Sequence, residues 1–489
     1  MDVCLILEGT YPYVSGGVSS CVYQLIKNTP EIKYHLVFIG PTPDDYTEMK
    51  YEIPDNVVSL KEVYLFDYEL EGELVELGPY FNKNVIHSFH EELKKGEYSL
   101  FIDIFKKIFS SGHRPFNPMD ILRSKEAWDI LEKHYNTQFD NKDNVSFVDY
   151  FYTWRFIHFP IFKLLMADIP MASIYHSMCT GYAGLYGVAA KLMYDKPLVL
   201  TEHGIYTNER EIEISQADWV YQENNELDLT RSSSFFKSWW INIFKFMGKL
   251  TYDMSDTITT LYYGNMQKQI SYGADQKKIK IFPNGVNLKR FKKVVKKLKD
   301  RNVIALIGRV VPIKDIKSFI KAVNILLTFH PDTDIWILGP TDEDKEYFEE
   351  CVMLSKMLGI EDRIVFKGKV NLVEYFSMID LIVLSSISEG QPIVILEAFA
   401  CSIPVISTDV GACRELIYGM TEDDKKLGKA GEVVPFGRPD LLAEEIGKLL
   451  TNPDNIKKLG KIGNVRVNKY YTEEIYINNY LSMYKKMIR

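Results

Sequence analysis

Residues 380–407 read "DLIVLSSISEGQPIVILEAFACSIPVIS", and this stretch decides the fold class. The apolar runs at its two ends have the length of buried strands, and the apolar run between them has the length of a short helix. Pro392 suits the first position of that helix, where its missing N–H would have had no partner. The stretch therefore predicts a strand, a loop, a helix and a second strand, the unit from which parallel sheets are built.

The same alternation of strand-like and helix-length segments continues outward in both directions. The further strand-like runs are "VCLILEG" (3–9), "YHLVFIG" (34–40), "PLVLTEHG" (197–204), "DTITTL" (256–261), "KIKIFPNG" (278–285), "NVIALIGR" (302–309), "DIWILGP" (334–340) and "RIVFKGKV" (363–370). Strands that alternate with helices indicate parallel sheets covered by helices on both faces. We expect an α/β protein made of two doubly wound, Rossmann-like halves.

A lysine-rich segment, "VNLKRFKKVVKKLKDRN" at 286–302, separates the two runs of alternation. It indicates an interdomain linker, because it has no strong core pattern and a new strand follows at once. We therefore expect an N-terminal domain over residues 1–285 and a C-terminal domain over 286–469. Residues about 70–155 predict a helical insertion in the first domain, and residues 470–489 predict a terminal helix that packs back on it.

Composition restricts the classes of partner. The formal net charge is −8, which disfavours general attraction to nucleic acid, and the six scattered cysteines have no CxxC spacing and predict reduced thiols in a cytoplasmic protein. No uninterrupted apolar run is long enough to cross a membrane. The aromatic and basic segment at 233–249 predicts an amphipathic helix, for which a core-facing position is favoured over contact with a membrane or a partner.

Two carboxylates, Glu389 and Glu397, lie eight residues apart in the apolar stretch. A helical path of that length spans about 12 Å, longer than the roughly 5 to 9.5 Å that separates the carboxylates of glycoside hydrolases. We therefore disfavour an acid/base couple and expect two separate hydroxyl-binding groups. Arg309 and Lys314 follow the first strand of the second half, where two cations can neutralise a diphosphate.

The first half also carries polar groups after its strands. Gly16 and Gly17 lie where the first strand gives way to a helix, and His203 ends the strand at 197–204. Ligands of parallel sheets bind outside the carboxyl ends of the strands, and a helix N-terminus favours phosphate. Taken singly, a double glycine or a lone histidine is more often structural. His176 in "YHSMCTG" also ends a predicted strand, and it could line a binding site.

Five of these motifs, in chain order, resemble those of a known family. Gly16 with Gly17, "LTEHG" at 200–204, Arg309, Lys314 and the Glu-x7-Glu pattern resemble the retaining glycosyltransferases of family 4, which have the GT-B fold of two Rossmann-like domains facing a cleft. More narrowly, "MDVCLILEGTYPYVSGGVSS", "HSMCTGYAGLYG", "LTEHGIYTNERE" and "SEGQPIVILEA" are similar to the PelF subfamily, which is associated with synthesis of the Pel exopolysaccharide in biofilms. Gln391 replaces the aromatic residue that is usual in the wider family.

The resemblance implies roles for these residues in holding a nucleotide sugar. Arg309 and Lys314 would hold the diphosphate, Glu397 the ribose and Glu389 the transferred sugar. His203 would lie beside the anomeric carbon, so that His203, Glu389, Arg309 and Lys314 form the catalytic set. The remaining donor contacts would come from Gly16, Gly17, Lys369, Val370, Gly390, Gln391, Pro392 and Ile393, with Lys369 and Val370 at the nucleobase.

The resemblance also implies a reaction and its partners. We expect transfer of a hexose from UDP-glucose or another UDP-hexose, with retention of configuration, without a metal or other cofactor, to an oligosaccharide or polysaccharide acceptor. Inner-membrane polysaccharide synthase and export proteins would be partners, which places the protein in the cytoplasm or at the inner face of the membrane. The alternatives are a nucleotide-sugar-binding scaffold without catalysis, a GT-B epimerase or a glycogen-synthase-like enzyme; an NAD dehydrogenase is disfavoured because GxGxxG is lacking.

Overall fold

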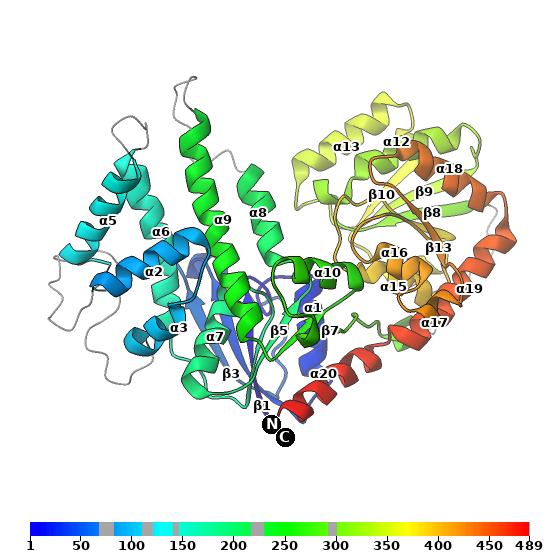
Figure 1. Ribbon diagram of the computed structural model, residues 1–489. Helices are drawn as coiled ribbons and strands as arrows, with labels where there is room; N and C mark the ends of the chain where they lie inside the picture. The colour runs from blue at the N-terminus through cyan, green and yellow to red at the C-terminus, as the bar shows by residue number, and fades with distance from the viewer. Residues whose placement is uncertain are drawn as a thin grey trace. The chain divides into compact units, whose positions relative to one another are not determined.

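The chain forms two compact α/β units, drawn in Figure 1 from a computed structural model that describes residues 1–67, 83–109, 120, 122–139, 146–216, 229–291 and 301–488. Unit 1 comprises Met1–Thr260, Met266–Lys280 and Leu481–Arg489, and unit 2 comprises Leu261–Asn265 and Ile281–Tyr480. The linker expected at 286–302 lies mostly outside the described residues, as do parts of the insertion expected at about 70–155. Each unit is built around its own sheet.

The sheet of unit 1 has seven strands in the order β3-β2-β1-β4-β5-β6-β7. The strands are β1 (Asp2–Glu8), β2 (Lys33–Gly40), β3 (Val57–Tyr64), β4 (Ile174–Ser177), β5 (Leu198–Glu202), β6 (Thr257–Thr260) and β7 (Ile279–Ile281). β1 pairs in parallel with β2 and β4, and β5 pairs in parallel with β4 and β6. All five residues of β5 are buried, as expected of a strand covered on both faces.

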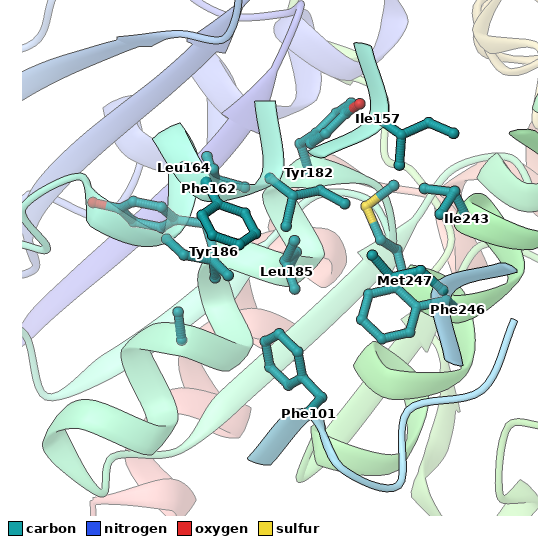
Figure 2. Packing of buried hydrophobic residues seen from close by; sticks show 14 of the residues in the cluster. Phe101, Ile157, Phe162, Leu164, Tyr182, Leu185, Tyr186, Ile243, Phe246 and Met247 are labelled. Carbon is teal, nitrogen blue, oxygen red and sulfur yellow. The ribbon is translucent and has the colours of Figure 1, made fainter. Parts of the chain in front are cut away.

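The helices of unit 1 include those of the expected insertion. They are α1 (Gly17–Lys27), η1 (Pro43–Asp45), α2 (Lys83–Lys95), α3 (Phe101–Ile104), η2 (Phe105–Phe109), α5 (Lys125–Gln138), α6 (Phe147–Met166), α7 (Tyr182–Tyr194), α8 (Tyr206–Gln216), α9 (Leu229–Met254), α10 (Tyr263–Ser271) and η3 (Gln276–Lys278). Figure 2 shows how Phe101, Leu185 and Met247 from α3, α7 and α9 lie in one apolar core. The insertion therefore shares the core of unit 1.

The aromatic and basic helix expected at 233–249 is part of α9, and its apolar side faces this core. Ile243, Phe246 and Met247 are fully buried, and Figure 2 shows them directed toward the side chains of α7. Lys245 on the same helix pairs with Glu211 of α8. The core-facing interpretation of this segment is correct, and none of the helices among the described residues is long and apolar enough to cross a membrane.

The sheet of unit 2 has six strands in the order β10-β9-β8-β11-β12-β13. The strands are β8 (Asn302–Ile307), β9 (Thr333–Leu338), β10 (Ile364–Gly368), β11 (Leu381–Leu384), β12 (Val405–Thr408) and β13 (Gly431–Val434). All of its neighbouring strands pair in parallel. Successive side chains of β8 enter two different apolar cores, since Val303 lies in one and Ile304 in the other. Both faces of the sheet are thus covered, and the doubly wound fold is confirmed for this half.

Helices follow nearly every strand of unit 2. They are α11 (Leu288–Phe291), η4 (Pro312–Lys314), α12 (Ile316–Leu327), α13 (Lys345–Met357), η5 (Glu361–Arg363), α14 (Leu372–Phe376), α15 (Ile393–Ala400), α16 (Cys413–Tyr418), α17 (Glu422–Lys425), α18 (Pro439–Leu450), α19 (Pro453–Tyr470) and α20 (Glu473–Met487). α15 begins at Ile393, and Pro392 is the N-cap residue before it. The helix therefore begins one residue later than the sequence predicted. The last helix, α20, contributes Tyr480 to unit 2 and Tyr484 to unit 1.

Candidate functional site

In unit 2, the loops that follow β8 and β11 bring together two of the predicted site residues. The Lys314 ammonium Nζ donates to Glu389 Oε1 at 2.6 Å, and Ser386 Oγ donates to the same oxygen at 2.6 Å. Only 10% of the Glu389 side chain and 22% of the Lys314 side chain are exposed. A hydrogen bond between ions in such a sheltered place is stronger than one at an open surface. The pair therefore fixes a cation and a carboxylate at the carboxyl edge of the sheet.

Backbone contacts hold these loops in register. Ser385 Oγ donates to the carbonyl of Lys314 at 2.9 Å, and the N–H of Ile387 donates to the carbonyl of Ile313 at 2.9 Å. The loop after β12 supports the other side, where Gly411 has φ of 54°. A Cβ at position 411 would lie 2.2 Å from the carbonyl oxygen of Glu389, so glycine is required by both conformation and contact.

Glu397 lies apart from this pair, on the second turn of α15. Its Oε1 is 3.6 Å from Nη1 of Arg290, and 13% of its side chain is exposed. Burial raises the pKa of Glu397 to about 7, and the positive charge of Arg290 opposes that shift. The carboxyl group thus has a proton affinity suited to exchanging hydrogen bonds with hydroxyl groups near neutral pH.

The other predicted residues of unit 2 have different surroundings. Arg309 does not contact Glu389; its Nη1 donates to Glu343 at 2.8 Å, in the loop after β9. Gln391 is buried, and its Oε1 accepts from the N–H of Asn284 at 2.6 Å. Gly390 accepts from the N–H of Ala412 at 2.8 Å. Lys369 is exposed and Val370 is half-buried, both directly after β10. These positions stay predictions as donor contacts.

In unit 1, a cavity of about 520 Å³ opens at the carboxyl ends of β1 and β5. His203 lines this cavity together with Glu8, Tyr206, Arg210 and Trp240. Polar groups with exposed aromatic faces are a common lining for sugar-sized and larger polar ligands. The cavity is therefore a candidate binding site in unit 1, at the edge of the sheet where ligands of this fold class bind.

Two neighbouring histidines of unit 1 differ sharply in their hydrogen bonding. His176 is fully buried; its Nε2 lies 2.7 Å from Thr201 Oγ1 and its Nδ1 lies 2.5 Å from the Tyr484 hydroxyl. Burial lowers the pKa of His176 to about 3 and that of His203 to about 4, so both rings are neutral at physiological pH. The Nε2 atom of His203 is shielded and has no hydrogen-bond partner within the protein. His176 is thus a structural group, while Nε2 of His203 is a buried polar atom that no hydrogen bond from the described residues satisfies.

The backbone at the start of α1 does not require glycine at positions 16 and 17. Gly16 has φ of 174°, an extended conformation open to any residue, and a Cβ at Gly16 or Gly17 would meet nothing within 4 Å. Both residues are exposed. Their glycine identity therefore leaves the backbone N–H groups at the N-terminus of α1 accessible to close approach.

Sequence reasoning missed two residues that build the unit 1 cavity. Glu8 ends β1; its carboxylate accepts from the N–H of Ala183 at 3.0 Å and from the hydroxyl of Tyr206 at 2.5 Å. Gly181 allows this arrangement, because a Cβ there would lie 2.4 Å from the Tyr206 ring. Glu8 stands at the end of the first strand, a position that could have marked it, whereas Tyr206 comes from a separate element without a comparable signal.

Glu202, the residue before His203, lies in the core of unit 1. Its carboxylate accepts from the Tyr252 hydroxyl at 2.6 Å, from Gln269 Nε2 at 2.9 Å and from Thr180 Oγ1 at 3.1 Å. Burial raises the pKa of Glu202, and these hydrogen bonds favour the charged form and counter the rise. Glu202 therefore anchors the end of β5 and with it the backbone that carries His203.

The two parallel-sheet Rossmann-like units and their loop-borne polar groups define a two-domain α/β protein of the GT-B type. The chain belongs to the family described as "Domain of unknown function (DUF3492)", which matches residues 1–277, more than half of the chain. Residues 288–466 match the family described as "Glycosyl transferases group 1". The loop that holds Lys314 and the loop that holds Glu389 both fall in this second region.

Known proteins resemble the chain in sequence and in fold. N-acetyl-alpha-D-glucosaminyl L-malate synthase of Bacillus anthracis is 28% identical over 178 residues, which are 36% of this chain and 43% of that protein, so the match spans less than half the relative's length. Sucrose-phosphate synthase from Thermosynechococcus elongatus has a TM-score of 0.60 at 15% identity and covers 99% of this chain and 98% of that chain. HepE from Anabaena, in complex with UDP, has a TM-score of 0.60 at 12% identity and covers 99% and 100%. These structures share the fold.

Proposed function

We propose that this protein is a retaining glycosyltransferase that moves a hexose from a nucleotide sugar, UDP-glucose or another UDP-hexose, to a growing exopolysaccharide. The observation that carries the proposal is the sheltered pair of Lys314 and Glu389 at the carboxyl edge of the unit 2 sheet. A cation that is already positioned suits a diphosphate, and the adjacent carboxylate suits sugar hydroxyls. That HepE was solved with UDP supports the choice of nucleotide.

Unit 2 binds the donor in this proposal. Lys314 takes one charge of the diphosphate, and Arg309 turns from Glu343 to take another. Glu397 accepts hydrogen bonds from the ribose hydroxyls, and Glu389 accepts from the hexose. Charge that develops on the leaving diphosphate is stabilised by these fixed cations, which is the term that contributes most to catalysis of such transfers.

The transfer proceeds with retention and needs no metal. The bond between the anomeric carbon and the phosphate oxygen breaks, and a bond to the acceptor oxygen forms on the same face of the sugar. The acceptor hydroxyl's proton passes to the departing phosphate oxygen, so atoms and charge balance without a further base. His203, neutral at physiological pH, donates or accepts one hydrogen bond to the sugar and takes no proton in the reaction.

Unit 1 binds the acceptor in this proposal, in the cavity lined by Glu8, His203 and Trp240. The aromatic wall can stack on a sugar ring and the carboxylate can accept from its hydroxyls. The PelF-like motifs at 1–20 and 200–211 suggest a polysaccharide acceptor and membrane-bound synthase and export partners at the inner face of the membrane. These partners follow from the sequence resemblance.

The test is a donor screen with purified protein, in which release of the nucleoside diphosphate is measured for UDP-glucose, other UDP-hexoses and their GDP counterparts in excess EDTA. Release of UDP in EDTA, with NMR showing an unchanged anomeric configuration in the product, is the expected result. Activity that disappears in EDTA and returns with a divalent ion would overturn metal independence. Tight UDP binding without turnover of any donor, with acceptor oligosaccharides present, would instead support the scaffold alternative.

A further inference from the structure

Four of the nine histidines of the chain lie together in unit 1, far in sequence from the predicted site residues. His87 and His90 are one turn apart on α2, His134 is on α5 and His158 is on α6. The ring centroid of His134 lies 4.3 Å from that of His87 and 4.6 Å from that of His90, and the His90 and His158 centroids are 5.1 Å apart. Three helices of the insertion thus direct imidazole rings to one point.

A chain of hydrogen bonds fixes the orientation of His90. Nδ1 of His158 lies 2.7 Å from the carbonyl of Trp154, so Nδ1 carries the proton and Nε2 of His158 is left as an acceptor. Nδ1 of His90 lies 3.2 Å from that acceptor and therefore also carries its proton. As a result, Nε2 of His90 presents its lone pair, and only the distant Tyr150 hydroxyl, at 3.4 Å, approaches it. Imidazoles that bind metals are commonly oriented by such a second-layer contact.

The carboxylate of Glu91 completes the cluster beside His134. Its Oε1 lies 2.8 Å from Nδ1 of His134. The other ring nitrogen, Nε2 of His134, is shielded from solvent, since only 6% of the residue is exposed. It has no hydrogen-bond partner among the described residues. One potential ligand atom from each of His90, Glu91 and His134 lies within 4.8 Å of the others. An ion that binds Nδ1 of His134 and Oε1 of Glu91 would take the place of the proton that these two atoms share.

We propose that His90, Glu91 and His134 bind a zinc ion, and that His87, whose ring packs against that of His134, rotates to supply the fourth ligand. Imidazole nitrogens and carboxylate oxygens both bind zinc, and four ligands are the number that a closed structural zinc site requires. His87 lies one helical turn from Glu91, on the same face of α2. Its ring is half-buried, so an ion can enter from that side.

A lysine opposes the binding of a cation by this cluster. Nζ of Lys94 lies 3.4 Å from Oε1 of Glu91. Lys94 therefore competes with an ion for this carboxylate.

Zinc at this position would act as a structural cross-link. It would join α2 to α5 within the insertion, in addition to the apolar core that these helices already share. The site lies outside the proposed sugar-binding cavity, since none of the cluster residues lines that cavity. Zinc loss is therefore expected to lower stability without removing a group that contacts donor or acceptor.

The test measures metal content and affinity in tag-free, full-length protein. We expect close to one zinc per chain by mass spectrometry after purification in zinc-containing medium, and a higher midpoint of thermal unfolding when zinc is added back to EDTA-treated protein. Glu91→Gln and His134→Gln each remove one ligand. Each should weaken zinc binding, in competition with a chromogenic chelator, by more than the roughly 10- to 100-fold that loss of a supporting hydrogen bond costs.

Two further variants keep the proposal falsifiable if a ligand variant folds poorly. Lys94→Gln removes the competing cation and should tighten zinc binding, which no purely structural effect on folding explains. His330→Gln is the matched control, because His330 lies in unit 2, and it should leave zinc binding unchanged. Zinc affinity that is equal in all four variants, or no zinc-dependent rise in unfolding temperature, would overturn the proposal. Donor turnover in EDTA at a temperature where the protein is folded separates this outcome from the proposed transfer.

Discussion

The ammonium of Lys314 and the carboxylate of Glu389, which come from the loops after two adjacent strands, form a 2.6 Å ion pair. In the proposed reaction the diphosphate takes the ammonium, and Glu389 is then free to accept hydrogen bonds from the hexose. A free sugar without the diphosphate has to compete with Lys314 for the same oxygen. The pair thus makes hexose recognition depend on the diphosphate.

Replacing Lys314 by Ala should lower kcat for donor turnover by about 100-fold or more, because a fixed cation at the leaving group is lost. Stability should fall by about 1 to 3 kcal/mol, because the sheltered Glu389 carboxylate loses its partner, so kcat is compared per folded molecule. Lys317→Ala is the control: Lys317 pairs with Glu350 at 2.6 Å on the surface of α12. Steady-state kinetics and chemical denaturation of both variants check this. Equal kinetic losses in the two would contradict the role of Lys314.

The raised pKa of Glu397 predicts a dependence of stability on pH. Its folded-state pKa of about 7 lies above the ordinary value of 4.5, so the folded protein binds the proton more tightly than the unfolded chain. This contribution is fully present below pH 4.5 and is lost as the pH rises to 7, by up to about 3 kcal/mol. Glu397→Gln should abolish that part of the pH dependence in urea denaturation. A variant with the same slope as the wild type would disprove the assignment.

Gly411→Ala should lower the stability of the protein, because the alanine side chain would collide with the backbone of the loop that carries Glu389. Gly359 is a matched control: it also has a positive φ, 68°, but a Cβ there would meet nothing within 4 Å. Gly359→Ala should cost only the roughly 1 to 2 kcal/mol of the left-handed backbone. Gly411→Ala should cost more and should also weaken UDP binding in calorimetry. Unchanged UDP affinity would show that the loop does not bind the donor.

His203 and His176 should respond differently to substitution by Gln. His203→Gln should lower kcat at least about tenfold, about 1.4 kcal/mol of activation free energy, with little effect on the unfolding temperature. His176→Gln should lower the unfolding temperature, because both of its ring nitrogens have partners in the core. Calorimetry and kinetics on the two variants check the contrast. A His203 variant that is destabilised but fully active per folded molecule would reverse the assignment.

Most of the sheet could be predicted from local patterns, and the exceptions have a physical reason. Buried strands such as β8 and β11 are continuous apolar runs, because helices cover both of their faces. β3 and β13 did not stand out in the sequence. They lie at the edges of their sheets, and β3 includes exposed Val58 and partly exposed Lys61, so an apolar run is not required there.

The candidate site was predictable where a motif directly follows a strand. Lys314 lies in the motif after β8 and Glu389 in the motif after β11, and these two strands are neighbours in the sheet. Arg309 was expected beside them, but its guanidinium donates to Glu343 in the loop after β9. The histidine cluster on α2, α5 and α6 had no signal in the sequence, since its members come from three helices whose packing is not encoded in local spacing.

The last helix has a consequence for how the chain is made. Tyr484 hydrogen-bonds His176 in the centre of unit 1, yet every residue of unit 2 precedes it in the chain. During synthesis the ribosome therefore releases the whole of unit 2 before unit 1 can receive its last buried side chain. Unit 2 can complete its own core first, and unit 1, although its sheet begins at the N-terminus, finishes folding later.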